Sequence, residues 1–133
     1  MKKILLILVI CLPLLLTACG SSRPTTAIKV NVTDFAYNPN EFIVPAGQEI
    51  TVEITNNGAV VHNFIIMKAG ASIGKDFDEE DAANEYWKVE IMPGQSTTAS
   101  FTAPSAPGEH LIVCSTPGHY IAGMTGRLVV VSE

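Results

Sequence analysis

Three side chains that can bind a soft metal lie close together near the C-terminus. Cys114, His119 and Met124 follow one another at intervals of five residues. One connecting loop is expected to carry them, because one apolar segment ends at Cys114 and the next begins at Gly126. A thiolate, an imidazole and a thioether on one loop can converge on a single point. A second imidazole is available from His62, which opens an earlier apolar segment.

This combination of side chains predicts a metal centre that transfers electrons. Two imidazoles, one thiolate and a weakly bound thioether are the ligands of mononuclear blue copper sites. Thiolate and thioether suit Cu(I), and imidazole suits both oxidation states, so little has to move when an electron arrives. Each residue alone has a plainer interpretation, since a lone cysteine or methionine in a β domain usually packs in the core. The combination at a strand–loop–strand boundary favours copper.

Few residues remain for a second metal centre or for catalysis. The chain has three histidines, and His110 lies four residues before Cys114, about 13 Å away along an extended strand. His110 therefore cannot share the metal, and we expect it to be packed or partly exposed. Met67 and Met92 are expected to pack. We predict a one-electron carrier that is not an enzyme. The alternative is a copper-binding module for storage, delivery or sensing.

The N-terminus has the pattern of a secreted lipoprotein. Lys2 and Lys3 precede an apolar run over residues 4–16, which is shorter than the roughly 20 residues of a membrane-spanning helix and typical of a signal peptide. The sequence L-T-A-C at residues 16–19 then resembles the lipobox of bacterial lipoproteins. That resemblance implies cleavage before Cys19 and a lipid on its thiol. The alternative is a soluble secreted protein in which Cys19 is a chance thiol.

The domain organisation follows from this pattern. We predict a lipoprotein signal peptide over residues 1–18, a lipidated Cys19 with a polar tether over residues 19–27, and one domain over residues 28–133. Of the chain's eight basic residues, Lys2 and Lys3 lie in the signal peptide, so six remain against 13 acidic residues. This negative balance makes nucleic acid a poor partner. Cys114 is left without a disulfide partner in the domain, so it needs another role in an oxidising compartment. We expect a monomer, extracytoplasmic and lipid-anchored to a membrane in the periplasm or on an outer face.

The rest of the sequence predicts short β-strands separated by turns. Apolar and polar residues alternate in residues 28–32 and 50–54, and Asn, Gly and Pro mark the turns. Further strands are expected at residues 42–44, 62–67, 89–92, 97–101, 108–114 and 126–131. Seven or eight short strands predict an all-β fold, a Greek-key β-sandwich. Residues 69–88 lack the alternation, and the carboxylates of residues 76–85 predict a short acidic helix or loop, either a docking patch or a solvated segment.

These features resemble the cupredoxin family, with plastocyanin-like and auracyanin-like single-domain proteins nearest. The resemblance covers residues 28–131 and rests on V-H-N at 61–63, on G-E-H-L-I-V-C at 108–114, and on the loop into T-G-R-L-V-V at 125–130. It implies an eight-stranded sandwich with one copper ion, Cu(II)/Cu(I), near one end. It also implies that His62, Cys114 and His119 are the strong ligands and Met124 the long axial one.

The same resemblance implies roles for two neighbours of His62. Asn63 would hold the loop after Cys114 by hydrogen bonding, and Val61 would direct a backbone carbonyl toward the metal. Four residues separate Cys114 from His119, as in auracyanins and rusticyanins, whereas plastocyanins have two.

An apolar surface beside His119 is the expected exit for electrons. Electron transfer decays steeply with distance, and an exposed apolar patch commonly marks an interaction site. The expected partners are redox proteins, either a cytochrome or a membrane electron-transfer complex. The residues expected to dock them are Pro117, Tyr120, Ile121 and Ala122.

Overall fold

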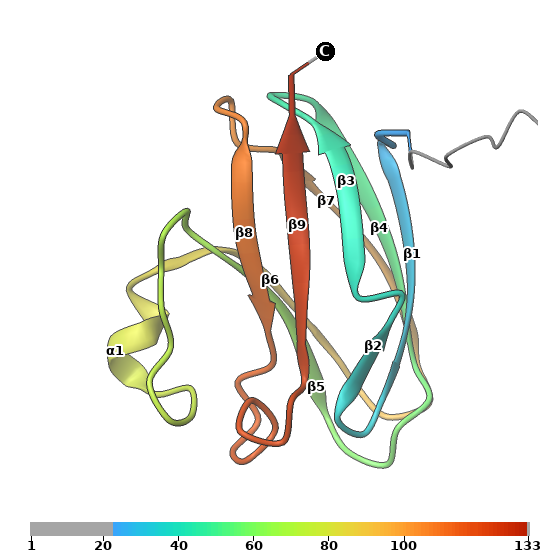
Figure 1. Cartoon of the computed structure of the whole chain (residues 1–133). Coiled ribbons are helices and arrows are strands. Elements are labelled where there is room, and N and C mark those ends of the chain that lie inside the picture. Colours follow the sequence, from blue (N-terminus) through green and yellow to red (C-terminus); the bar gives the residue numbers. More distant parts are fainter. Residues whose placement is uncertain (1–22, 133) are drawn as a thin grey trace, which may run out of the picture.

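The fold is a sandwich of two β-sheets, seen in a computed structural model that describes residues 23–132 (Figure 1). The predicted signal peptide and Cys19 lie outside the described residues. One sheet has the order β2-β1-β4-β7 and the other the order β3-β9-β8-β5-β6. The expected all-β sandwich is confirmed. The strands are β1 (Ala27–Thr33), β2 (Ala36–Asn38), β3 (Glu41–Pro45), β4 (Glu49–Asn56), β5 (His62–Met67), β6 (Glu85–Ile91), β7 (Ser96–Thr102), β8 (Gly108–Val113) and β9 (Thr125–Val131).

Period-two alternation builds the core between the sheets. In β1 and β4 every second residue is buried, and Ile28 of β1 lies opposite Val52 of β4 in a parallel pairing. Phe64 of β5 is fully buried and makes edge-to-face contacts with Tyr37 and Phe42. Burying an Ile, Val or Phe side chain contributes about 1.5–3 kcal/mol, so this apolar layer holds the strands that carry the site.

The structure has nine strands within residues 23–132 where the sequence predicts seven or eight. The additional strand is β2, whose three residues are too few to show a period. The structure also starts β6 at Glu85, although the sequence predicts an acidic helix or loop as far as residue 88. The sequence there, E-Y-W-K, places two aromatic residues side by side and so hides the alternation.

Residues 68–84 form an excursion between β5 and β6 that contains the short helix α1 (Glu79–Ala82). Asp78 caps this helix by accepting from the backbone N–H groups of Glu80 and Asp81, and the Asp81 side chain accepts from the Asp78 N–H in return. A reciprocal pair of this kind satisfies donors that a helix start leaves unpaired. Two of the carboxylates in the predicted acidic segment are therefore structural caps.

The excursion packs on the outer face of the five-stranded sheet. We call this contact region the outer cluster; its buried members are Ile65, Met67 and Val113, and the half-buried side chains packed on them are Ala71, Ile73, Phe77, Leu111 and Tyr120. The segment is therefore more than a solvated loop. Within residues 23–132, no helix is long and apolar enough to cross a membrane.

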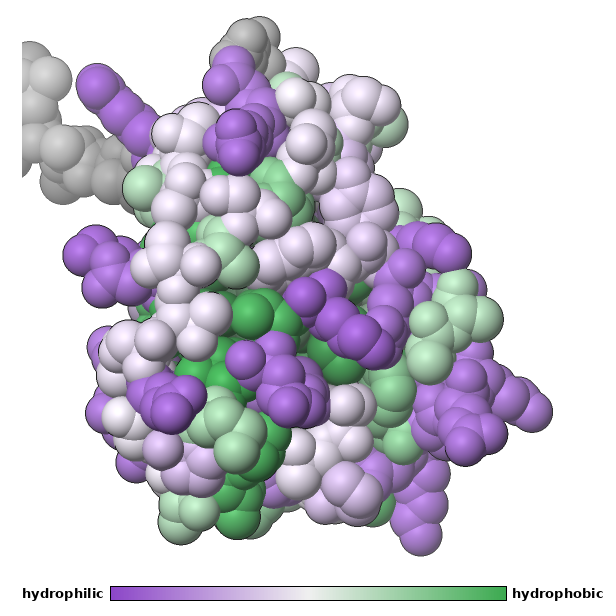
Figure 2. Space-filling view, turned by 180° about the vertical axis from the view of Figure 1, so that it is seen from behind, coloured by the Kyte–Doolittle hydropathy of each residue, from purple (hydrophilic) through white to green (hydrophobic). Residues whose placement is uncertain are grey.

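Three connections gather at one end of the sandwich (the lower end in Figure 1): the β1–β2 turn, the β4–β5 loop and the β8–β9 loop. The described chain begins at the opposite end, where β1 starts. Seen from behind, the surface shows hydrophilic residues gathered on the side of the excursion and hydrophobic residues reaching the surface toward the lower end (Figure 2).

Candidate metal centre

Adjacent antiparallel strands bring Cys114 and His62 together. His62 is the first residue of β5, and Cys114 directly follows β8. The two strands pair with Ile65 opposite Val113, so the start of β5 lies beside the end of β8. The two side chains meet there although 52 residues separate them in the sequence.

The ligand loop, residues 115–124, folds back on itself and returns its far end to this point. His119 donates its N–H to the carbonyl of Thr116 at 3.0 Å, and Met124 donates its N–H to the carbonyl of His119 at 3.0 Å. Gly118 and Gly123 take φ angles of 82° and 94°, which glycine adopts readily and other residues seldom do. The turns therefore place an imidazole and a thioether next to the thiol.

The donor atoms have the spacing that a trigonal metal site needs. The Cys114 Sγ lies 3.9 Å from the His62 Nδ1 and 3.7 Å from the His119 Nδ1. Metal bonds of about 2.0 Å to imidazole and about 2.3 Å to thiolate, set 120° apart, would separate sulfur from nitrogen by about 3.7 Å. All three residues are buried, and Met124 is fully buried in the same core cluster as Cys114. This donor set fits one copper ion.

Asn63 and Thr116 hold the thiol and its flanking backbone. The side-chain oxygen of Asn63 accepts from the Ser115 N–H at 3.3 Å and from the Ser115 hydroxyl at 2.6 Å, while the Asn63 N–H donates to the Cys114 Sγ at 3.4 Å. The Thr116 hydroxyl donates to the carbonyl of Val61 at 2.9 Å. The Val61 carbonyl thus fastens the ligand loop to the end of the β4–β5 loop, directly before His62. Its expected approach to the metal stays a prediction.

The environment of His119 keeps its imidazole neutral. Burial lowers the pKa of His119, and repulsion from the His62 ring lowers it further. Neutral imidazole is the form that binds a metal. The ring of Phe35 packs edge-on against His119 with 5.1 Å between centroids, although Phe35 itself is half exposed. No pattern in the sequence pointed to Phe35.

Two carboxylates that no sequence pattern indicates also reach the site. The Asp34 Oδ1 lies 3.1 Å from the His62 Nε2, and the Asp76 Oδ2 accepts from the Gly118 N–H at 2.7 Å. These pairs are 28 and 42 residues apart in the sequence. Local spacing therefore gives no signal for either contact.

The structure separates the predicted docking residues into two groups. Pro117, Ile121 and Ala122 are exposed, with Ile121 at 54% of its full surface, whereas Tyr120 is half buried in the outer cluster. His110 is buried and bonds through Nδ1 to the carbonyl of Met67 at 2.9 Å, in the packing role expected of it. Met92, expected to pack, is instead exposed on the turn after β6.

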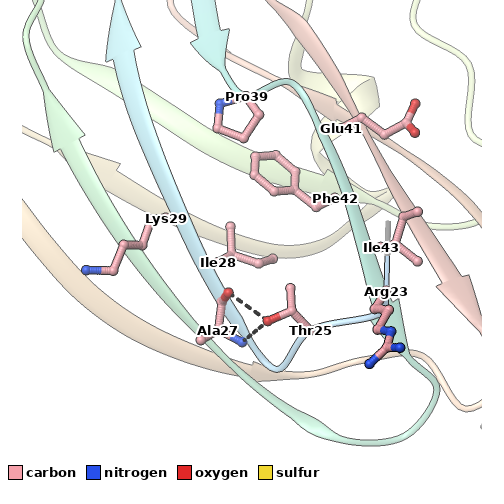
Figure 3. Close-up of a pocket in the computed structure, with 9 residues that line it drawn as sticks. All are labelled: Arg23, Thr25, Ala27, Ile28, Lys29, Pro39, Glu41, Phe42 and Ile43. Atoms are coloured by element: carbon pink, nitrogen blue, oxygen red, sulfur yellow. Dashed lines mark hydrogen bonds between the residues drawn. The ribbon is translucent and has the colours of Figure 1, made fainter. Parts of the chain in front are cut away.

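A groove of about 240 Å³ lies between β1 and β3 (Figure 3). None of the four candidate ligands lines it. Its residues are Arg23, Thr25, Ala27, Ile28, Lys29, Pro39, Glu41, Phe42 and Ile43.

Sandwich, ligand loop and donor set together define a cupredoxin. Residues 24–131 match the family described as copper binding proteins, plastocyanin/azurin family, and the chain belongs to that family. Auracyanin-A of Chloroflexus aurantiacus is 35% identical over 126 residues, which cover 84% of this chain and 76% of that protein. Auracyanin-B of the same organism is 26% identical over 80% of this chain, and the match spans about half (52%) of that protein.

A solved structure has a similar fold. The dithionite-reduced auracyanin from Roseiflexus castenholzii superposes with a TM-score of 0.69 at 34% identity, covering 82% of this chain and 99% of that one. The chain is thus a blue copper electron carrier with one copper ion, whose site is formed by His62, Cys114, His119 and Met124. When bound, the copper supplies a one-electron couple between Cu(II) and Cu(I).

Proposed function

We propose that this cupredoxin is held to a membrane by a lipid on Cys19 and shuttles single electrons between redox proteins outside the cytoplasmic membrane. The observation that carries the proposal is the order of features at the N-terminus: positive charge, a short apolar run, and L-T-A-C at residues 16–19. Two or three acyl chains anchor a protein firmly where one chain is marginal. The described chain enters the domain at the start of β1, at the end opposite the ligand loop. An anchor on that side would leave the metal end open to partners.

The proposed contact surface is the apolar end of the domain around His119. Ile121 and Ala122 of the ligand loop are exposed there, and the exposed side chain of Phe35 lies directly against His119. A partner that covers these residues comes within one side chain of a copper ligand. The partner chemistry this surface suits is a redox protein with an apolar rim, such as a cytochrome or a membrane electron-transfer complex.

The buried ligands favour a carrier over a module for storage or delivery. His62 and Cys114 are fully buried and His119 is 7% exposed. A protein that hands its metal to another must let an incoming ligand reach it, and this site offers no such approach to His62 or Cys114.

Fractionation of cells that express Cys19→Ser tests the anchor. The expected result is a protein that moves from the membrane fraction to the soluble extracytoplasmic fraction with an unchanged blue absorption band. Cys11→Ser, a matched change inside the apolar run, should stay in the membrane fraction. A Cys19→Ser protein that remains tightly membrane-bound would contradict the lipid anchor.

A further inference from the structure

The β1–β2 turn presents a carboxylate to the outer nitrogen of a copper ligand. The His62 Nδ1 faces the Cys114 Sγ at 3.9 Å, and the Nε2 of the same ring faces the Asp34 Oδ1 at 3.1 Å. The His62 ring is completely buried, whereas the Asp34 side chain is 41% exposed. Asp34 therefore links a buried ligand to the surface of the domain.

This arrangement determines which nitrogen of His62 carries the proton. A nitrogen that binds a metal must present a lone pair, so a ring that binds through Nδ1 carries its proton on Nε2. A carboxylate is an acceptor without a proton to give, so it favours this tautomer. Carboxylates bonded to metal-binding histidines fix the ring orientation and make the ligand more basic.

The neighbouring backbone holds the Asp34 carboxylate in place. The Ala59 N–H donates to it, at 3.1 Å to Oδ1 and 3.3 Å to Oδ2. A Cβ on Gly58 would lie 2.5 Å from the Asp34 Oδ1 and 2.7 Å from the His62 Nε2. Contacts that short do not occur, so the absence of a side chain at residue 58 is what lets carboxylate and imidazole meet. Phe35, next in the turn, takes a φ of 71°, which is rare for a bulky residue.

We propose that Asp34 is a positioning residue for the copper site: it fixes the Nδ1-binding tautomer of His62 and lowers the reduction potential. Its negative charge lies one imidazole ring away from the metal position. Cu(II) carries one more positive charge than Cu(I), so the carboxylate stabilises the oxidised state more than the reduced state.

Two substitutions separate the two effects. Asp34→Asn keeps an oxygen acceptor of nearly the same shape and removes the charge, and Asp34→Ala removes both. Loss of such a partner typically weakens metal binding by 10–100-fold. For Asp34→Ala we expect Cu(II) binding to weaken about tenfold relative to Cu(I), which equals a rise in potential of about 59 mV for one electron. Asp34→Asn should give a smaller rise, and that rise should shrink with added salt because the carboxylate is partly exposed.

The control is Glu49→Gln, which removes one exposed carboxylate at the far end of β4. Its potential should equal that of the wild type. If Asp34 only held the β4–β5 loop in place, its substitution would lower the melting temperature of the apoprotein and leave the reduction potential unchanged. Potentials of both Asp34 variants that match that of Glu49→Gln would overturn the proposal.

A second measurement needs no copper. Nitrogen-15 NMR of the apoprotein reports the tautomer of His62 directly, and we expect the Nε2–H form in the wild type and in Asp34→Asn. In Asp34→Ala the two tautomers should mix. An unchanged Nε2–H tautomer in Asp34→Ala would also refute the proposal. Because the wild type must first show its blue band, failure of the copper site itself would be recognised separately, and the lipid anchor does not enter the test.

Discussion

The positions and protonation of individual donor atoms determine how this site binds its metal. Three donors from Cys114, His62 and His119 lie at distances that suit a trigonal copper ion, and Met124 is fully buried in the same core cluster. Burial lowers the pKa of His119, so this ligand stays in its metal-binding form at neutral pH. The four side chains thus form a closed site whose properties depend on small changes in each donor.

Substitution of Met124 should change the potential more than it changes copper retention. A long axial bond holds the metal weakly but tunes its potential. Met124→Leu removes a weak donor and destabilises Cu(II) more than Cu(I), so the potential should rise. Met124→Gln supplies a harder oxygen donor and should lower it. Voltammetry of both variants checks this, with Cys114→Ala, which should lose the blue band, as the control; shifts in the reverse order would show that Met124 is not the axial ligand.

At the scale of elements, the excursion supports the ligand loop from outside. Tyr120 of the loop packs in the outer cluster with Phe77, and the Asp76 carboxylate accepts from the Gly118 N–H. That hydrogen bond is the main reason why the pKa of Asp76 lies below its ordinary value. A segment whose carboxylates suggested only docking or solvation therefore also fastens the residue before His119.

Loss of the Asp76 charge should destabilise the apoprotein in a pH-dependent way. A carboxyl group whose pKa is lowered on folding stabilises the fold above its ordinary pKa, and this contribution is lost as the pH falls through the lowered value. The melting temperature of apo Asp76→Asn should therefore lie below that of the wild type at pH 7. The difference should begin to shrink below a pH of about 4, the ordinary pKa of an aspartate, and disappear only once the pH has fallen through the lowered pKa of Asp76. Glu79→Gln, an exposed carboxylate of the same excursion, provides the control, and a difference that persists unchanged in acid would contradict this role.

The sequence predicts the strands and the four candidate ligands for a physical reason. Strands show up as an alternation of fixed period, and three of the four ligands lie close together in the sequence, so strands and ligands both leave local patterns. β2 is too short to show a period, and E-Y-W-K at the start of β6 hides one. Asp34, Phe35 and Asp76 reach the site only through tertiary packing, and such contacts leave no spacing in the sequence.

At the scale of the whole molecule, exposed charge and exposed apolar residues lie on two different segments of the domain. The excursion carries exposed acidic residues, and the ligand loop carries the exposed apolar residues Ile121 and Ala122. Exposed charges steer an encounter over about one Debye length, about 8 Å at physiological salt. Apolar contact beside His119 acts later, in the bound complex in which the electron is transferred. The two surfaces should therefore respond differently to salt.

Changes in the ligand loop should slow electron transfer at any ionic strength. Ile121→Lys or Ala122→Lys places a charge in the proposed contact surface next to a copper ligand. Neutralising Glu79 and Glu80 together should slow transfer only at low salt and only with a basic partner. Asp78 and Asp81 are left intact, because their side chains cap α1. Stopped-flow rates of electron transfer to the native partner measure both effects. If the loop variants transfer electrons at the wild-type rate while the acidic variants are slower even at high salt, electrons leave by another surface.

The position of the first described residues has a consequence for the reach of the carrier. The chain enters the sandwich at the end opposite the ligand loop, and the seven polar residues 20–26 of the tether extend at most about 25 Å. Strands of seven or eight residues add about 25 Å more. With the proposed lipid anchor, copper would thus range through a shell that extends about 50 Å from the bilayer. Within that shell the number of carriers per unit area of membrane, more than their bulk concentration, would determine the rate of encounter. Partners whose redox centres lie inside the shell would meet the carrier most often.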